Sequence, residues 1–388
     1  MAQAPVHNAL QQIHTLAAQG QIALAAARAG AALDESSLAP TPLLQATLAL
    51  LEGVKQLHAG AFEAGLRLAL PAIGTVERSE YAAQLAWAHS AIGFGIGSLG
   101  DPNGGLAWVD RAIALTEDGH QPVNAQRAHG HQGCLLGLIG EHDQAIDALT
   151  EALTLAQQIG ATDAEADCLN RLADTCLDRA RASTNTPERR RTSATQALGC
   201  ADRALVLARA AAAVSACAQA HNSRARALIL LEERPAAGLA LQDATVAAAN
   251  FPELAVEVLQ TAARFRIACG ELVRARRHLD EGLAQARAHG FELVYGRLLE
   301  ERVRVERAAG CPEASLIWFE RRVEHLQTQY QQRLQMLSRC AALQQPSPQA
   351  EDEAFWTPRP PVATGDTARG YRTGSGMNSV SPGTRSKR

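Results

Sequence analysis

Residues 140–155, GEHDQAIDALTEALTL, decide the fold of this chain. After the opening glycine, Ala145, Leu149 and Ala152 recur at steps of four and three residues, which is the spacing of one α-helix face. The small residues at 145 and 152 let a second helix approach closely, and Leu149 fills the space between them. Residues 129–139 before the glycine also follow a helical pattern. The segment therefore predicts a helical hairpin with a tight turn at Gly140.

The same unit recurs along the chain at a period near forty residues. The small residue that follows each turn occupies eight aligned positions: Ala25, Gly65, Gly105, Ala145, Ala197, Ala237, Ala275 and Ser315. The steps between them are 40, 40, 40, 52, 38, 38 and 40 residues. In six of the eight units a glycine stands five residues earlier. A fixed period with matching small residues is typical of a solenoid, so we predict an all-α array of about eight helical hairpins.

This register resembles the tetratricopeptide repeat. The matching residues of one unit are His129, Gln132, Gly133, Leu136, Ala145, Leu149 and Ala152, and those of the unit before are His89, Ile92, Gly93, Ile96, Gly105, Val109 and Ala112. The resemblance spans residues 6–343. The period is longer than the usual ~34 residues, and the closing proline is absent from its normal place. The resemblance therefore implies longer helices on a tetratricopeptide plan, a right-handed superhelix whose first helices line a concave groove.

A narrower resemblance concerns the end of the array. Long-period arrays that finish in an extended amphipathic helix are similar to the sensory regions of bacterial diguanylate cyclases, in which that helix leads into a GGDEF catalytic domain. This sequence has no GGDEF motif, and residues 344–388 are too few for such a domain. The resemblance implies an isolated or truncated signalling input module.

Composition agrees with this fold class and limits the function. Apolar residues make up 47% of the chain but aromatic residues only 4%, so the interior consists mainly of Ala and Leu, which favour closely packed helices. The net charge of −3 argues against a dedicated nucleic-acid binder. The charge is uneven: residues 1–160 carry 14 acids and 6 bases, whereas residues 161–343 carry 22 acids and 25 bases.

Cysteine usage and the chain ends indicate a cytoplasmic protein. The eight cysteines include no closely spaced pair, as expected of buried thiols in a reducing compartment. The N-terminal sequence MAQAPVHNALQQIH has no basic start and no apolar core, so it does not read as a signal peptide. No run reaches ~18 consecutive apolar residues, and we expect no transmembrane helix.

Two segments depart from the regular array. An insertion, STNTPERRRT, lengthens the fifth unit, and we predict a protruding loop at residues 183–192. Within it, Thr186 as cap and Pro187 at the first position form a helix start. Residues 344–388 are rich in Pro, Gly, Ser, Thr and Arg, which predicts a disordered tail after the array of residues 1–343. Gly93, Gly95 and Gly97 weaken one helix, and we expect a flexible joint there.

No catalytic motif emerges, and we expect neither an enzyme nor a bound cofactor or metal. The segment GIGSLG at residues 95–100 matches the dinucleotide fingerprint, but it lies inside a repeat helix instead of between a strand and a helix. His129, His131, Cys134 and His142 form the densest group of potential metal ligands. His131 and Cys134 could share a helix face, yet a second convincing ligand pair is missing.

A polar face on the first helices of units five to eight is the candidate binding surface. Its residues are Asn170, Arg171, Asp174, Asn222, Arg226, Arg264 and Arg304. Arg226, Arg264 and Arg304 occupy one repeat position, so stacking would align them in a ladder. Arginine forks suit carboxylates, which favours an acidic peptide or protein segment as ligand. The alternative is an ordinary solvated polar face. Upstream the groove face is expected to be apolar or small, at Leu50, Val54, Trp87, Phe94, Gly130 and Cys134.

The last unit ends in a predicted long helix over residues 312–343. Leu326, Tyr330, Leu334 and Leu337 continue an apolar stripe beyond the length that unit eight covers. Such a stripe resembles a coiled-coil seam and predicts a weak homodimer through this helix.

Together these features predict a non-enzymatic scaffold or signalling input module that binds a protein or peptide in its concave groove. The alternatives are a helical-repeat regulator of transcription acting through a partner and, as a third class, a metal-dependent enzyme. We find no helix-turn-helix module in the sequence. A membrane or nucleic-acid partner is not expected.

Overall fold

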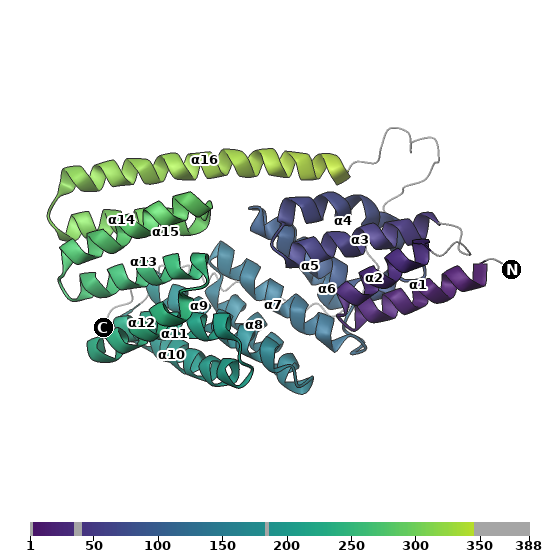
Figure 1. Ribbon diagram of the computed structural model, residues 1–388, viewed down its shortest axis with the longest axis horizontal. Helices are drawn as coiled ribbons and strands as arrows, with labels where there is room; N and C mark the ends of the chain where they lie inside the picture. The colour runs from purple at the N-terminus through teal and green to yellow at the C-terminus, as the bar shows by residue number, and fades with distance from the viewer. Residues whose placement is uncertain (1–2, 35–40, 183–185, 345–388) are drawn as a thin grey trace, which may run out of the picture. The chain divides into compact units, whose positions relative to one another are not determined.

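The computed structural model describes residues 3–34, 41–182 and 186–344, and this part of the chain contains α-helices, one 3-10 helix and no strand. The helices of the first four pairs are α1 (Gln3–Ala18), α2 (Ile22–Asp34), α3 (Pro42–His58), α4 (Phe62–Glu77), α5 (Ala86–Ser98), α6 (Pro102–Ala114), α7 (Pro122–Ile139) and α8 (His142–Gln158), and the 3-10 helix η1 (Ala82–Gln84) lies between α4 and α5. The last four pairs are α9 (Thr162–Arg181), α10 (Pro187–Ala210), α11 (Val214–Leu230), α12 (Arg234–Ala248), α13 (Pro252–Ala268), α14 (Leu272–His289), α15 (Glu292–Ala308) and α16 (Pro312–Gln344). The all-α array of eight helical hairpins is confirmed (Figure 1).

The turns within the pairs follow the predicted glycine positions. Glycines at 20, 60, 100, 140, 270 and 310 all adopt positive φ angles, a conformation that costs an L-residue strain but costs glycine little. In the sixth hairpin Glu232 takes the same conformation, with φ at 64°. All eight aligned small residues that follow these turns are buried, from Ala25 to Ser315. The small-residue register therefore marks where the two helices of each pair meet.

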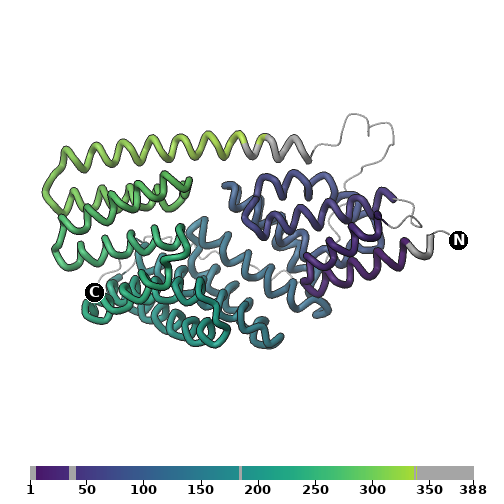
Figure 2. The backbone as a smooth tube through the Cα atoms, in the orientation of Figure 1, coloured from purple at the N-terminus to yellow at the C-terminus, as the bar shows by residue number. Residues whose placement is uncertain are grey.

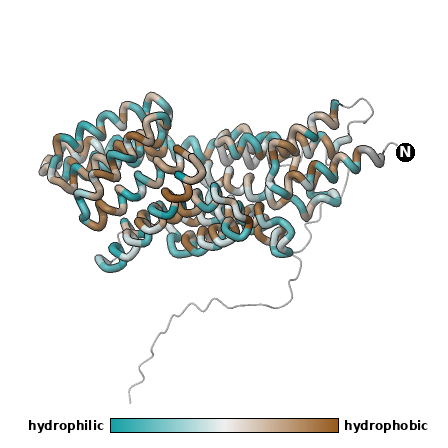
Figure 3. The backbone as a smooth tube through the Cα atoms, turned by 60° about the horizontal axis from the view of Figure 1, so that its bottom comes forward, coloured by the Kyte–Doolittle hydropathy of each residue, from teal (hydrophilic) through white to brown (hydrophobic). Residues whose placement is uncertain are grey.

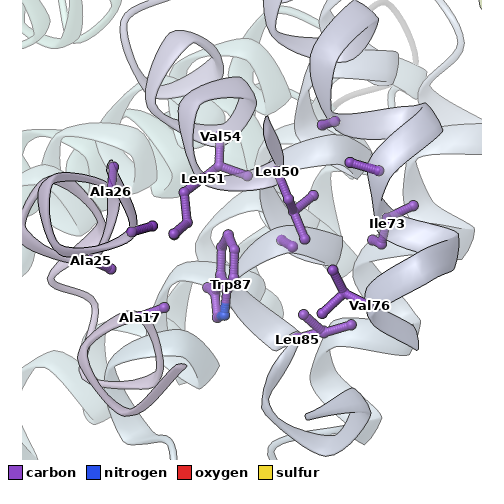
Figure 4. Close-up of a cluster of buried hydrophobic side chains, with 14 of the residues drawn as sticks. Ala17, Ala25, Ala26, Leu50, Leu51, Val54, Ile73, Val76, Leu85 and Trp87 are labelled. Atoms are coloured by element: carbon purple, nitrogen blue, oxygen red, sulfur yellow. The ribbon is translucent and has the colours of Figure 1, made fainter. Parts of the chain in front are cut away.

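The core is a row of small clusters between neighbouring helices. The largest joins the first three pairs, and Leu51, Trp87 and Val76 are among its buried side chains (Figure 4). Figure 3 shows hydrophilic and hydrophobic residues alternating along each helix, as amphipathic stacking requires. Leu50, Val54 and Trp87 belong to this core, so our expectation that they line an apolar groove is wrong.

The glycines of α5 have a packing role that the sequence did not indicate. Gly93 and Gly97 are buried, and a Cβ on Gly97 would lie 2.1 Å from Cδ2 of Leu135 on α7. A Cβ on Gly93 would lie 2.5 Å from the backbone carbonyl oxygen of Gly105, so α5 and α6 approach too closely there for a side chain. The expected flexible joint is instead a close-packed helix crossing.

The insertion of the fifth unit lengthens a helix. Thr186 caps α10, its hydroxyl accepting a hydrogen bond from the backbone N–H of Arg189, as predicted. Residues 187–192 form the first turns of α10, so the arginines at 189–191 are exposed on a helix and not on a loop. Residues 183–185 and the predicted tail from residue 345 onward lie outside the described residues.

The last helix, α16, contacts two distant parts of the array. This helix of 33 residues packs against α15 in its first part and contacts α4 further along (Figures 1 and 2). The aliphatic part of Arg333 lies against Gly100, at the turn between α5 and α6. We expected the apolar stripe to have no partner within the chain beyond Leu326; the helix does contact α4, but Leu326, Tyr330 and Leu334 of the stripe remain about half exposed.

Candidate functional site

A pocket of about 320 Å³ opens where α9, α11, α13 and α15 lie next to one another, and we call it the arginine pocket. Four of the seven predicted groove residues line it: Asn222, Arg226, Arg264 and Arg304. Each comes from the first helix of its hairpin, and the 38- and 40-residue steps bring them to equivalent heights on adjacent helices. The wall also holds Asp178, Arg181, Glu257, Gln260, Thr261, Arg297 and Glu300.

The three ladder arginines are paired with carboxylates inside the array. Arg226 Nη1 lies 2.5 Å from Asp174 Oδ1, which also accepts a hydrogen bond of 2.9 Å from Ser223 Oγ. Arg264 Nε donates to Glu301 Oε1 at 2.6 Å. Arg304 reaches Glu300 at 2.5 Å and Glu301 at 3.1 Å. The ladder exists, but it is a network of ion pairs across neighbouring repeats instead of a row of free cations.

One arginine of the pocket is less well compensated. Burial lowers the pKa of Arg181 well below its usual range, and the neighbouring guanidinium groups of Arg226 and Arg264 lower it further. Its nearest carboxylate, on Asp178, lies 3.6 Å away. An arginine side chain nevertheless keeps its charge in proteins, so the local field favours an additional anion beside it. Burial and the charge of Asp174 raise the pKa of Glu257, which lines the same pocket.

Side-chain amides supply uncharged donors in this pocket. Gln260 is 5% exposed, and its Nε2 has no hydrogen-bond partner among the described residues. Asn222 is also buried, and its Oδ1 accepts a hydrogen bond from Thr261 Oγ1 at 2.7 Å. This bond does not use the amide nitrogen of Asn222. A buried amide without a partner is costly. The pocket is therefore suited to a ligand with carbonyl oxygens.

The other three predicted residues do not line the arginine pocket. Asn170 is 1% exposed and donates to the carbonyl of Ala216 at 3.3 Å, so it joins α9 to α11. Asp174 does not line the pocket but forms an ion pair with Arg226. Arg171 faces a separate pocket shared by α5, α7 and α9, where it pairs with Asp167 at 2.7 Å.

Arg181, Glu257 and Arg297 were missed as pocket residues, although their spacing contained the signal. Arg181 lies three residues after Asp178 on the face of α9 that also carries Asp174. Glu257 and Arg297 stand seven residues before Arg264 on α13 and Arg304 on α15, and Arg181 stands seven residues after Asp174. Each predicted helix face, extended by two turns, would have included them.

The part of the chain that the structure describes contains no group of three or more His, Cys, Asp or Glu side chains placed to hold a metal ion. His131 instead stacks on Phe94, and Cys134 accepts a hydrogen bond from Arg171. Gly95 and Gly97 of the dinucleotide-like segment lie within α5, without the strand and loop that phosphate binding needs. Among the described helices none has the length and apolar character to cross a membrane.

Comparison of the fold with solved structures gives several similar helical-repeat proteins. A Rap protein in complex with Competence and Sporulation Factor has a TM-score of 0.61 at 12% identity, over 76% of this chain and 77% of that one. The Rap conjugation gene regulator of plasmid pLS20, in complex with the Phr* peptide, has a TM-score of 0.57 at 14% identity, over 74% and 76%. The apo quorum sensor NprR from B. thuringiensis has a TM-score of 0.57 at 12% identity, over 89% of this chain and all of that one.

These likenesses confirm the tetratricopeptide-like helical-repeat fold. No family model matches the chain, and a search of curated proteins found no match. The resemblance to diguanylate cyclase sensory regions stays a prediction.

Proposed function

We propose that this chain is a non-enzymatic, peptide-binding repeat protein, and that the arginine pocket takes a peptide segment bearing a carboxylate. The observation that carries the proposal is the buried, unpartnered Nε2 of Gln260 at an open pocket. Gln260 and Asn222 would donate to backbone carbonyls of an extended peptide. This main-chain recognition is independent of peptide sequence, so the arginines would supply selectivity.

The charge of the pocket favours an acidic side chain near Arg181. Arg226 and Arg264 have carboxylate partners at 2.5 Å, whereas the nearest carboxylate to Arg181, on Asp178, is 3.6 Å away and two guanidinium groups lie near it. A ligand carboxylate beside Arg181 would relieve that repulsion and could recruit Arg304, which is exposed. Charge-assisted hydrogen bonds of this kind contribute about 1.5–3 kcal/mol each.

The structural neighbours support a peptide as the ligand class. Two of them were solved with a signalling factor or a peptide bound, and a third is a quorum sensor. Because identities are 10–14%, these neighbours support the fold and suggest only the class of ligand. The seven described cysteines form no disulfide, in keeping with the proposed cytoplasmic location.

The experiment compares peptides that differ only in charge. Immobilised random hexapeptides would be screened with the full chain, and each binder containing Asp or Glu would be remade with Asn or Gln. We expect the amide versions to bind about tenfold or more weakly, and the difference to shrink at high salt. Equal binding of acidic and amide versions would refute the carboxylate preference.

Variants locate the binding surface. Replacing Arg226, Arg264 and Arg304 together by Ala, or Gln260 alone by Ala, should weaken binding of the acidic peptides. The matched control replaces Arg190, Arg191 and Arg234, three exposed arginines without a carboxylate partner among the described residues. If the control weakens binding as much as the pocket variants do, the surface charge and not the pocket is responsible.

A second candidate is a regulator that passes peptide binding on to a partner protein, including a regulator of transcription. The observation in its favour is that one neighbour is a conjugation gene regulator. A partner that binds the chain with and without the selected peptide at different affinity would support this role.

A further inference from the structure

A second pocket of about 370 Å³ lies at the other end of α9, and we call it the aromatic pocket. It is bounded by the end of α3, the start of α4, and by α5, α7 and α9. The ring of Phe94 stacks on His131 at 4.5 Å between centroids, and Phe62 meets Phe94 edge-on at 5.9 Å. These three side chains form an aromatic platform inside the pocket, in which the ring of Phe62 stands nearly perpendicular to that of Phe94.

The platform is uncharged at neutral pH. Burial lowers the pKa of His131 to about 3, and nearby Arg171 lowers it as well. Burial and Arg127 lower the pKa of His58, at the pocket edge, to about 4. Both imidazoles are therefore neutral, and an aromatic ring can pack against the Phe94–His131 pair without meeting a cation there.

One cation of this pocket lacks a carboxylate partner. Asp167, the acidic residue of the pocket wall, is engaged by Arg171. The guanidinium of Arg127 makes one hydrogen bond to the described residues, from Nη1 to the carbonyl of Gly20 at 3.4 Å. Arginine offers five donors in a fixed fork that fits a carboxylate. A half-buried charge with one weak partner favours an anionic ligand group.

The pocket also has room beside α7. A Cβ built on Gly130, which lines the pocket, would meet nothing within 4 Å. A ligand ring can therefore approach the backbone of α7 between Arg127 and His131, which lie on either side of Gly130 along that helix.

The two pockets share α9 and so lie along one helix. Arg171 faces the aromatic pocket and Arg181 the arginine pocket. Ten residues of helix correspond to about 15 Å at 1.5 Å per residue. An extended peptide covers that distance with about five residues at ~3.3 Å each. One short peptide can therefore reach both pockets.

We propose that the aromatic pocket holds the C-terminal residue of the bound peptide, an aromatic residue whose free α-carboxylate pairs with Arg127 and whose ring packs against the Phe94–His131 pair. This inference rests on the proposed function, because it assumes that a peptide lies along α9. It goes further by assigning the peptide's direction and terminal residue.

Three small probes test the pocket alone, by calorimetric titration into the full chain. They are N-acetylphenylalanine, N-acetylphenylalaninamide, which lacks the carboxylate, and N-acetylalanine, which lacks the ring. We expect the first to bind about tenfold or more tightly than either of the others, as the loss of one charge-assisted contact implies. Equal affinities for the acid and its amide, or for N-acetylphenylalanine and N-acetylalanine, would overturn the proposal.

Two variants separate the carboxylate from the ring. Arg127→Gln should abolish the preference for acid over amide. Gly130→Leu should fill the pocket and remove binding of all three probes, and its control is Gly137→Leu, two turns along α7, where a Cβ also meets nothing within 4 Å. Circular dichroism verifies that each variant is folded. Unchanged binding in Gly130→Leu would overturn the site even if Arg127→Gln failed to fold.

A longer probe distinguishes a peptide end from a free aromatic acid. The acetylated pentapeptide Asp-Ala-Ala-Ala-Phe should bind about tenfold or more tightly than N-acetylphenylalanine, and the Arg226, Arg264 and Arg304 triple variant should lose that gain alone. If the short probe binds but the pentapeptide gains nothing, the peptide assignment is overturned. If instead the acidic peptides and their amide versions bind equally while N-acetylphenylalanine still binds more tightly than its amide, the proposed function is refuted and the aromatic pocket is supported.

Discussion

Gly93 of α5 and Gly105 of α6 face each other so closely that a Cβ on Gly93 would lie 2.5 Å from the carbonyl oxygen of Gly105. The relationship recurs one period earlier, where a Cβ on Gly53 would lie 2.8 Å from the carbonyl of Gly65. One period later the partner is Ala145, and the distance from a Cβ on Gly133 to its carbonyl oxygen is 3.0 Å. Backbone-to-backbone contact at a fixed repeat position thus sets how the hairpins close.

We therefore expect Gly93→Ala to destabilise the array. The added methyl group meets backbone atoms that cannot move away, and overpacking of this kind costs about 1–3 kcal/mol. Gly137→Ala is the control, because a Cβ there meets nothing within 4 Å and alanine gains up to about 1 kcal/mol over glycine in a helix. Urea denaturation followed by circular dichroism measures both. Equal stability of the two variants would contradict the close-contact account.

Leu149→Asp should destabilise the array beyond its own hairpin. Leu149 is fully buried in a cluster that includes Leu169 on the next hairpin. An unpaired carboxylate in that position is strongly unfavourable, and loss of the side chain alone costs about 2–5 kcal/mol. Thr150→Asp adds the same charge at an exposed neighbouring position and should change stability little. Hydrogen exchange should show lost protection in hairpins on both sides of α8, because neighbouring repeats share interfaces. Loss confined to α7 and α8 would argue against that coupling.

The register of small residues was enough to predict the hairpins, because each aligned position is buried where two helices meet. Sequence alone gave a wrong prediction at Gly93, Gly95 and Gly97. Three glycines lower the helix propensity of a segment, which predicts a weak helix. Their role is decided by contacts with other helices, and these contacts cannot be predicted from local sequence.

The candidate site was predictable in outline only. The repeat spacing located Asn222, Arg226 and Arg264 on one surface, since equivalent positions stack in a solenoid. It could not show that Arg226 pairs with Asp174, because that contact joins α9 to α11 over 52 residues of sequence. The aromatic pocket could not be predicted from the sequence for the same reason, because its walls come from five helices.

Because the ring of His14 is buried, we predict that the protein loses stability in acid. Its ring is fully buried, stacks on Tyr81 at 4.2 Å and lies 3.4 Å from Thr47 Oγ1, and burial lowers its pKa from 6.5 to about 4. The folded state disfavours the protonated ring. The contribution of His14 to the unfolding free energy is therefore present in full above about pH 6.5 and is lost as the pH falls towards 4. The loss is at most about 3 kcal/mol.

The variant His14→Gln isolates this contribution from those of the other histidines. Its unfolding free energy should fall less between pH 7 and pH 4.5 than that of the unaltered chain, as measured by urea denaturation at each pH. Identical pH dependence of the two proteins would show that His14 does not titrate as its burial implies.

The apolar stripe of α16 predicts weak self-association. Leu326, Tyr330 and Leu334 are 48, 62 and 46% exposed, while the helix packs on α15 and touches α4. The side chain of Leu337, the fourth residue of the predicted seam, lies outside the described residues. A stripe of half-exposed large side chains along one helix favours burial against a second copy of the same helix.

We expect the full chain to show a concentration-dependent dimer in sedimentation equilibrium, and replacement of Leu326, Tyr330 and Leu334 by Ser to give a monomer. Substitution is a better test than truncation, because α16 also contacts α4 within the chain and its removal would disturb the second and third hairpins. The control replaces Gln327 and Gln331 by Ser, two exposed polar residues of the same helix, and should leave the dimer intact. A full chain that stays monomeric at high micromolar concentration would mean that contacts with α15 and α4 satisfy this helix by themselves.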